Sequence, residues 1–243
     1  MNVTFDFTSR SVLVAGAASG IGRSTALRCL EAGATVLAMD VDASGLASLP
    51  QDGRMLTAKV DIADPRAVQA AIDDFAGRTG RIDGAVLTSA IQKRTPIDET
   101  TDADWQRHLD VNLSGIFYLV RALYPVMKRQ RSGSIVAFTS GLASNGWAGA
   151  AAYAATKAGI VGLVKSAALE LRTHGVRINA LSPGLVATPV FLNSASEEEL
   201  AMYERTLGVS QPEEVADTLM YLLSDIAAGI SGNVVERRLI ARA

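Results

Sequence analysis

Seven short apolar runs, separated by longer segments of helical periodicity, place the strongest constraint on the fold of this chain. The runs show little polar–apolar alternation and cover residues 11–16, 34–40, 53–60, 83–89, 133–140, 176–182 and 232–236. Uniformly apolar strands are typical of a parallel sheet that is buried on both faces. The segments between them predict helices near residues 20–32, 64–79, 102–129, 150–174 and 212–224. The alternation therefore predicts an α/β fold with one doubly wound parallel sheet of about seven strands and helices on both faces.

The length of the chain is compatible with one sheet of this size. Its 243 residues would suffice for one large α/β domain or two small ones. No repeat, low-complexity tract or linker rich in Pro, Gly and Ser divides the sequence. We therefore expect a single domain over residues 1–243.

The charge balance and the cysteine content exclude several classes of function. Lys and Arg total 23 against 25 Asp and Glu, so no global field attracts nucleic acid or an anionic membrane. No uninterrupted apolar stretch reaches the length of a membrane span, and the N-terminal residues lack the apolar core of a signal peptide. The single cysteine, Cys29, and the absence of metal-spaced Cys/His clusters indicate a reducing compartment and no metal site. We expect a soluble, cytoplasmic protein.

A glycine-rich turn follows the first predicted strand. Its sequence AGAASGIGRS spaces Gly16, Gly20 and Gly22 as GxxxGxG. Glycines let a backbone turn tightly and approach a pyrophosphate, which the following helix N-terminus can bind through free amides. A tight strand-to-helix turn without a ligand would show the same three glycines. The strand before, the helix after and an acidic residue on the next strand favour a dinucleotide site.

That acidic residue is Asp40, which ends the second predicted strand 18 residues after Gly22. A carboxylate in this place accepts hydrogen bonds from the ribose hydroxyls of adenosine and repels a 2′-phosphate. Neither Ser19 nor Val41 supplies a cation for such a phosphate. The sequence therefore favours NAD over NADP, although a solvated aspartate at a strand end remains the alternative.

A tyrosine and a lysine stand four residues apart in a segment of small residues, AAYAATKAGIVGL. On a helix, Tyr153 and Lys157 would share one face with Cβ atoms about 5–6 Å apart. Ser140 closes the fifth predicted strand, thirteen residues before Tyr153. Asn112 lies inside a predicted helix, where its modest helix propensity makes it unusual.

The glycine spacing together with Asn112, Ser140, Tyr153 and Lys157 resembles the short-chain dehydrogenase/reductase family, in its compact branch of roughly 250 residues. The resemblance extends to VDI (60–62), SPG (182–184), Thr188 and PEEVA (212–216). It implies a Rossmann fold and an NAD(P)-dependent oxidoreductase that transfers a hydride between nicotinamide and a small secondary alcohol or ketone.

The resemblance also implies a role for each member of the group. Tyr153 would be the general acid for ketone reduction and the general base for alcohol oxidation. A free phenol has a pKa near 10, and we expect Lys157 and the oxidised nicotinamide to lower it. Ser140 would donate a hydrogen bond to the substrate oxygen, and Asn112 would position a water that links Lys157 to solvent. A buried Asn112 amide that only binds the backbone is the alternative for that residue.

The cofactor and substrate residues implied by the resemblance follow the ends of the predicted strands. Those assigned to the cofactor are Gly16, Ser19, Gly20, Ile21, Gly22, Asp40, Val41, Asp61, Ile62, Ser89, Ala90, Tyr153, Lys157, Pro183, Gly184, Val186 and Thr188. Those assigned to the substrate are Gln92, Ser140, Leu142, Trp147, Tyr153, Leu185 and Phe191. Residues 189–209 are expected to form a loop over this largely apolar pocket. Lys93 and Arg94 could attract an acidic substrate, although adjacent cations on a loop are commonly just solvated.

Three segments depart from the family pattern. Ala15 stands where the family usually has a threonine, and LTSA (87–90) replaces Asn-Asn-Ala-Gly, so Thr88 and Ser89 could supply some of the lost hydrogen bonds. The chain ends GNVVERRLIARA, where the family usually continues into Val-Asp-Gly-Gly. We expect these changes to affect cofactor affinity and subunit packing more than chemistry.

Two other functions and the assembly state remain open. A non-catalytic NAD sensor would have lost Ser140, Tyr153 or Lys157, and all three are present. A sugar-nucleotide epimerase or dehydratase would need a larger C-terminal part. The segment 150–174 is apolar on more than one face, which predicts a homo-oligomer, a tetramer or a dimer. Arg237, Arg238 and Arg242 could pair with acids across the second tetramer interface or repel and leave dimers.

Overall fold

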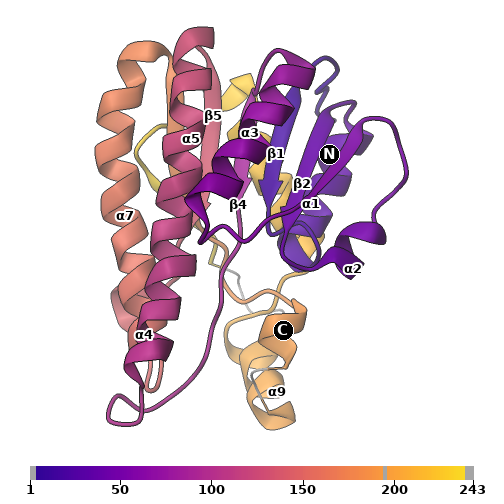
Figure 1. Ribbon diagram of the computed structural model, residues 1–243. Helices are drawn as coiled ribbons and strands as arrows, with labels where there is room; N and C mark the ends of the chain where they lie inside the picture. The colour runs from indigo at the N-terminus through magenta and orange to yellow at the C-terminus, as the bar shows by residue number, and fades with distance from the viewer. Residues whose placement is uncertain (1–3, 194–195, 239–243) are drawn as a thin grey trace.

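A parallel sheet of seven strands forms the centre of the molecule (Figure 1). The computed structural model describes residues 4–193 and 196–238. The strand order is β3-β2-β1-β4-β5-β6-β7, and every neighbouring pair is parallel. The predicted doubly wound parallel sheet is therefore confirmed.

Each predicted strand is present, with ends that differ from the prediction by at most two residues. The strands are β1 (Ser11–Ala15), β2 (Thr35–Asp40), β3 (Met55–Lys59), β4 (Gly84–Leu87), β5 (Gly133–Phe138), β6 (Val176–Ser182) and β7 (Val234–Glu236). All residues of β1 and β4 are buried, as expected for strands covered on both faces.

Helices cover the two faces of the sheet and enclose two apolar cores. The helices are α1 (Gly20–Glu31), α2 (Ala43–Ala47), α3 (Pro65–Thr79), α4 (Asp102–His108), α5 (Gly115–Gln130), α6 (Leu142–Asn145), α7 (Ala151–Leu171), α8 (Pro189–Leu192), α9 (Glu197–Thr206) and α10 (Pro212–Leu223). One core lies between the sheet and α3, α5 and α7, and the other lies between the sheet and α1 and α10. Figure 1 shows α5 and α7 side by side on one flank and α9 beyond one edge of the sheet.

The predicted helix 102–129 is not one regular helix. Between α4 and α5, residues Leu109–Ser114 form a π-helical segment that contains Asn112. Its backbone hydrogen bonds span one residue more than those of an α-helix. The side-chain amide of Asn112 binds the backbone of a neighbouring loop from within this π-helical segment. Its Oδ1 accepts from Ile91 N at 2.8 Å and its Nδ2 donates to Ile91 O at 2.9 Å, which ties this turn to the loop after β4.

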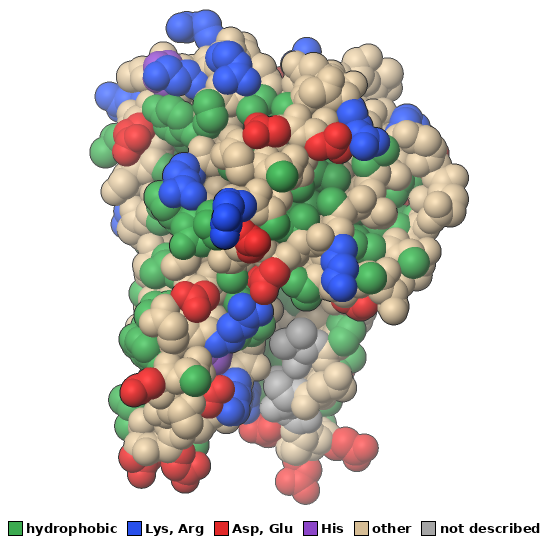
Figure 2. All heavy atoms as spheres, in the orientation of Figure 1, with side chains coloured by type: hydrophobic (Ala, Val, Ile, Leu, Met, Phe, Trp, Pro, Cys, Tyr) green, Lys and Arg blue, Asp and Glu red, His purple; other side chains and the backbone are tan. Residues whose placement is uncertain are grey.

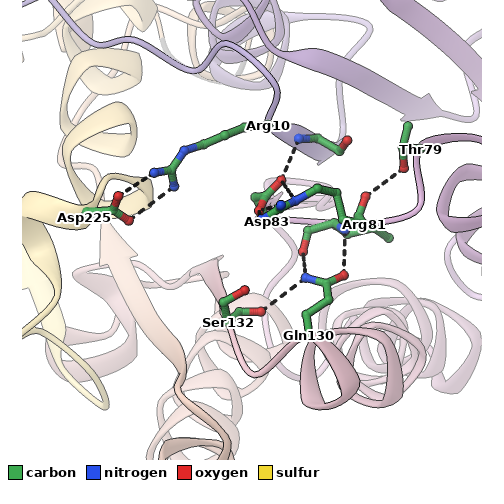
Figure 3. Close-up of polar contacts among 9 residues, drawn as sticks. Arg10, Thr79, Arg81, Asp83, Gln130, Ser132 and Asp225 are labelled. Carbon is green, nitrogen blue, oxygen red and sulfur yellow. Dashed lines mark hydrogen bonds and ion pairs between the residues drawn. The ribbon is translucent and has the colours of Figure 1, made fainter.

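The order of the strands reverses between β1 and β4, and ligands of such sheets bind beyond the carboxyl ends of the strands at this switch point. The opposite, amino edge is closed by contacts within the chain (Figure 3). There Asp83 accepts from Ser11 N at 2.9 Å and pairs with Arg81, while Gln130 bonds both backbone groups of Ile82. The carboxyl edge is therefore the place to examine for a site.

None of the helices in residues 4–193 and 196–238 combines the length and apolar character that crossing a membrane requires.

Candidate active site

Two hydrogen bonds fix the helix α7 to the end of strand β5. Lys157 Nζ donates to Phe138 O at 2.9 Å, and Thr139 Oγ1 donates to Lys157 O at 2.8 Å. The lysine side chain is almost fully buried, with 2% of its surface exposed. A buried ammonium with one fixed acceptor cannot swing away, so the turn of α7 that carries Tyr153 and Lys157 is held against the carboxyl edge of the sheet.

The predicted proximity of Tyr153 and Lys157 is confirmed. The ammonium of Lys157 lies 5.5 Å from the centroid of the Tyr153 ring. The Ser140 side chain forms a hydrogen bond with the Tyr153 phenol. Ser140 also fixes the start of α6, because its Oγ accepts from Leu142 N at 3.2 Å. The residues proposed for proton transfer are therefore adjacent in space.

In the protein without a cofactor the pKa of Tyr153 is raised, and the lowering expected with Lys157 and the oxidised nicotinamide together stays a prediction. Burial raises the pKa of Tyr153 from 10.0 to about 12, and the hydrogen bond from Ser140 offsets this only in part. Burial likewise lowers the pKa of Lys157 from 10.5 to about 8. Both shifts disfavour charge in a dry site, and the Lys157 ammonium is directed to Phe138 O rather than to the phenol.

The Asn112 side chain is bound within the chain, and its expected role in positioning a water stays a prediction. Its amide is committed to Ile91 through both atoms, with a longer contact of 3.4 Å to Thr156 Oγ1. The alternative, a buried amide that binds backbone, therefore describes the side chain.

The glycine-rich turn is packed against the end of β4. A Cβ on Gly22 would lie 2.0 Å from Gly16 O, and one on Gly16 would lie 2.4 Å from Thr88 Oγ1. Thr88 Oγ1 donates to Ala15 O at 2.7 Å, with a longer contact of 3.3 Å to Gly16 O. The Thr88 hydroxyl of the LTSA segment therefore ties the end of β4 to the glycine-rich turn, and whether it replaces hydrogen bonds of the family's Asn-Asn-Ala-Gly segment stays a prediction.

The N-terminus of α1 is open to an anion. Its N-cap residue, Ser19, is exposed and makes no side-chain capping hydrogen bond. The first amides of α1 then have no side-chain acceptor at the cap, which is the usual arrangement for binding a pyrophosphate. Asp40 lies beside this turn, where its Oδ2 accepts from Ala18 N at 3.0 Å. These donors and this carboxylate fit an adenine dinucleotide.

The other residues assigned to the cofactor lie along the same edge of the sheet. They are Ile21 in the first turn of α1, Val41 after β2, Asp61 and Ile62 after β3, Ser89 and Ala90 after β4, and Pro183, Gly184, Val186 and Thr188 after β6. Asp61 is also paired with Arg107 at 3.1 Å, and Thr188 caps α8. Their contacts with a cofactor stay a prediction.

The residues assigned to the substrate are partly brought together. Gln92 and Leu185 on loops and Leu142 at the start of α6 are half-buried at the carboxyl edge. A cluster that the sequence did not reveal lies beside them, because Tyr203 of α9 contacts the rings of Trp147 and Phe191 at centroid distances of 6.5 Å and 5.9 Å. The only signal for Tyr203 was its place within the expected loop 189–209.

The C-terminal arginines do not behave alike. Arg237 folds back on its own chain, where it donates to Ser210 Oγ at 3.2 Å and Pro183 O at 3.4 Å. Burial lowers the pKa of its guanidinium. Arg238 is exposed and pairs with Glu236, and Arg242 lies outside the described residues. Arg237 therefore anchors the base of the 189–209 loop and is not free for a subunit interface.

Comparison with known proteins decides the family. The family model described as "Enoyl-(Acyl carrier protein) reductase" matches residues 16–236 of this chain. The chain belongs to the short-chain dehydrogenase/reductase family. The structure superimposes on the crystal structure of levodione reductase with a TM-score of 0.90 and 32% sequence identity, over 96% of this chain and 97% of that one.

Several characterised members of this short-chain dehydrogenase/reductase family are similar over nearly their whole length. The 3-oxoacyl-[acyl-carrier-protein] reductase FabG of Thermotoga maritima is 35% identical over 92% of this chain and 94% of its own. Cis-4-hydroxycyclohexanecarboxylate dehydrogenase of Sinomonas cyclohexanicum is 34% identical, over 94% of this chain and 95% of its own. This short-chain dehydrogenase/reductase is therefore an oxidoreductase that acts on CH–OH or keto groups with a nicotinamide cofactor.

Proposed function

We propose that this enzyme interconverts a small secondary alcohol and its ketone, with Tyr153 as the general acid and base and NAD(H) as the preferred cofactor. The observation that carries the proposal is the group at the end of β5, where Tyr153 is hydrogen-bonded to Ser140 and stands 5.5 Å from the Lys157 ammonium. A phenol, a hydroxyl and a cation placed at one point suit proton transfer to a carbonyl oxygen.

When bound, the nicotinamide supplies or accepts the hydride at the carbonyl carbon. Ser140 holds the carbonyl oxygen by a hydrogen bond and stabilises the negative charge that develops there. Tyr153 transfers its proton to that oxygen, so one hydride and one proton convert the ketone to the alcohol. In the reverse direction the phenolate removes the hydroxyl proton.

The raised pKa of Tyr153 decides which protonation state of the phenol is present before the reaction. A phenol with a pKa of about 12 is fully protonated at neutral pH, which is the form required of an acid in ketone reduction. Oxidation needs the phenolate, which the buried Lys157 cation beside it favours. The protonated phenol is therefore the form of Tyr153 present at neutral pH in the protein by itself.

The preference for NAD(H) rests on Asp40. The carboxylate ends β2 next to the glycine-rich turn, and neither of the neighbouring positions 19 and 41 carries a cation. A 2′-phosphate would face this carboxylate without a counter-ion. We expect a higher kcat/KM with NAD(H) than with NADP(H), and a measured preference for NADP(H) would contradict this reading of Asp40.

We also propose a two-fold homo-oligomer built on α5 and α7, in a cytoplasmic enzyme whose residues 1–243 act as one domain. The outer face of α7 carries small residues at positions 155, 158, 162 and 166 and ends in Leu169, which is 65% exposed. On α5, Phe117 is 42% exposed. Two copies could bury these faces together. Light scattering tests the assembly, and a monomer of 25.5 kDa would contradict it.

The experiment that tests the reaction replaces Tyr153 with Phe. This keeps the ring and removes the transferable proton, so kcat should fall by roughly 10²–10⁴ while NAD(H) still binds. Tyr118→Phe on α5 serves as a matched control, because it removes a phenol hydroxyl from a helix face remote from Ser140. Wild-type turnover in Tyr153→Phe would refute the assignment, and cofactor binding without turnover of any alcohol or ketone by the unaltered enzyme would favour a sensor.

A further inference from the structure

The loop after β4 brings one cation, Arg94, to the wall of the proposed substrate site. The loop is fixed at both ends, because Ile91 is bonded to Asn112 and Thr95 N donates to Gly149 O at 2.8 Å. Gly149 lies four residues before Tyr153 in the chain. Arg94 is therefore held beside the segment that leads into the proposed catalytic helix.

The guanidinium of Arg94 is packed on an aromatic ring rather than extended into solvent. Its Cζ lies 5.8 Å from the centroid of the Trp147 ring, and 30% of the side chain is exposed. Trp147 in turn contacts Tyr203, which contacts Phe191. Stacking on a ring pre-orders an arginine for planar anions, because less side-chain entropy is lost when they bind.

The one acidic partner of Arg94 in the described part of the chain is held at a distance. Glu199 Oε1 lies 3.8 Å from Arg94 Nη1, which is longer than a hydrogen bond. The same carboxylate completes the capping box of α9, where its Oε2 accepts from Ser196 N at 2.9 Å. Glu199 is thus engaged through its other oxygen at the start of α9, and among the described residues the Arg94 guanidinium keeps unused donors.

The neighbouring cation does not compete for the same role. Lys93 Nζ is hydrogen-bonded to Asp104 at 2.8 Å, on the first turn of α4. Among residues 4–193 and 196–238, the Arg94 guanidinium forms no hydrogen bond with another residue. Figure 2 shows that the two lower lobes of the molecule, which include α4 and α9, carry acidic side chains at their tips. Exposed charges are screened beyond about 8–10 Å, so direct contact with the guanidinium decides the affinity of a small anion.

We propose that Arg94 determines substrate specificity by binding a carboxylate on the substrate, remote from the reacting carbon, in place of its loose contact with Glu199. The substrate class is then an alcohol or ketone with an apolar body and one carboxylate. This deepens the proposed function and rests on it for the reaction, but the binding of the carboxylate is testable without turnover.

The test measures the binding of two probes of equal shape, cyclohexanecarboxylate and the neutral cyclohexanecarboxamide, to the NAD-saturated enzyme by calorimetry. A charge-assisted bidentate contact predicts roughly 10-fold or greater preference for the carboxylate. Arg94→Gln should remove that preference and leave the carboxamide unchanged, while Arg94→Lys should restore part of it. Equal binding of the two probes to the wild type, undetectable carboxylate binding, or a preference that survives Arg94→Gln would overturn the proposal.

Glu199→Gln gives a prediction of opposite sign. Glutamine at this position keeps the capping box, because it can also accept from Ser196 N, but it removes the resident negative charge. The affinity for the carboxylate probe should become several-fold higher. If the contact between Arg94 and Glu199 instead holds the site in shape, the variant should bind the carboxylate more weakly. Lys93→Gln is the matched control and should leave the preference unchanged, since Lys93 is engaged with Asp104.

A kinetic arm separates this proposal from the proposed function. Reduction of 4-oxocyclohexanecarboxylate is compared with reduction of its methyl ester. Preference for the acid that depends on Arg94 supports both proposals, and equal turnover of the two overturns the role of Arg94 alone. If neither ketone reacts but the binding preference holds, the anion site stands and the assigned reaction fails.

Discussion

The two edges of the sheet differ in whether a buried charged side chain has an oppositely charged partner. At the amino edge, the Asp83 carboxylate, with 7% of the residue exposed, is bound by Ser11 N and by Arg81 (Figure 3). At the carboxyl edge, Lys157 is buried, and within the part of the chain that the structure describes its ammonium has one backbone carbonyl as its acceptor and no carboxylate. One edge satisfies its charge within the chain, whereas the other keeps an uncompensated charge in place.

This difference separates stability from function within one sheet. Removing the partner of a buried charge is strongly destabilising, and a buried charge without an opposite charge beside it lowers the stability. The lowered pKa of Lys157 reflects this loss of stability, because burial disfavours the charged form of the side chain. Sites that need such groups give up stability for activity. The predictions below test whether the two edges can be changed independently.

The largest effect is expected on turnover when Lys157 is replaced by Met. The substitution keeps an unbranched side chain and removes the cation beside Tyr153, so kcat should fall by roughly 100-fold or more. The measurement is steady-state reduction of a ketone with saturating NADH. A matched control, Lys165→Met, alters an exposed lysine two turns along the same helix and should leave kcat within about twofold of the wild type. A near-normal kcat in Lys157→Met would show that the buried cation at the carboxyl edge is not needed for activity.

At the amino edge, Asp83→Ala should lower the free energy of unfolding by about 2–4 kcal/mol, because Ser11 N and the Arg81 guanidinium lose their acceptor. Urea unfolding measures the change. Activity per folded molecule should stay normal, since Asp83 precedes β4 at the end of the sheet opposite the site. Arg81→Met is the control with a smaller loss, because about half of that arginine side chain is exposed. A large loss of activity per folded Asp83→Ala enzyme would show that the two edges are coupled.

The sequence predicted the sheet, and it singled out candidate site residues that the fold brings to one edge, because both depend on local patterns. Apolar runs of strand length mark the buried strands, and the glycine spacing and Ser140, Tyr153 and Lys157 all follow strand ends. Features that depend on contacts between distant segments were missed. The π-helical turn requires the bond from Asn112 to Ile91, and the return of Arg237 to Ser210 requires the fold itself.

The pKa values at the site were beyond sequence reasoning for the same reason. Spacing alone placed Lys157 next to Tyr153 and suggested a lowered phenol pKa. It could not show that burial of both side chains would outweigh their mutual effect, nor that Phe138 O would accept from the ammonium.

The third prediction concerns the stability of Lys157→Met as a function of pH. The pKa of Lys157 is about 8 in the folded protein and near 10.5 in the unfolded chain, so the unfolded chain binds more protons between these values. The wild-type free energy of unfolding should therefore rise, relative to the variant, by about 2 kcal/mol from about pH 7.5 to 9.5. Below pH 8 the variant should be the more stable by about 1–3 kcal/mol, after subtraction of its lost hydrogen bond to Phe138 O.

Chemical unfolding of both proteins at several pH values measures this difference. The range ends below pH 10 because the raised pKa of Tyr153 acts with the opposite sign above that value. If the difference in free energy of unfolding between the wild type and Lys157→Met does not change with pH, the pKa of Lys157 is not lowered by burial and this prediction is wrong.

The smallest effect is expected from Thr88, whose hydrogen bond to the backbone of Ala15 supports the carboxyl edge. Thr88→Val keeps the shape of the side chain and removes the hydroxyl that donates to Ala15 O at 2.7 Å. The glycine-rich turn should then be less well ordered, and the Kd for NAD(H) should rise about 3- to 10-fold, corresponding to about 1 kcal/mol for one neutral hydrogen bond. Thr88→Ser keeps the hydroxyl and should restore most of the affinity. Because Thr88 belongs to the internal support of this edge, kcat at saturating cofactor should stay within about twofold of the wild type. A large fall in kcat without a change in Kd would mean that Thr88 acts on the reacting group, and that the carboxyl edge does not separate support from chemistry.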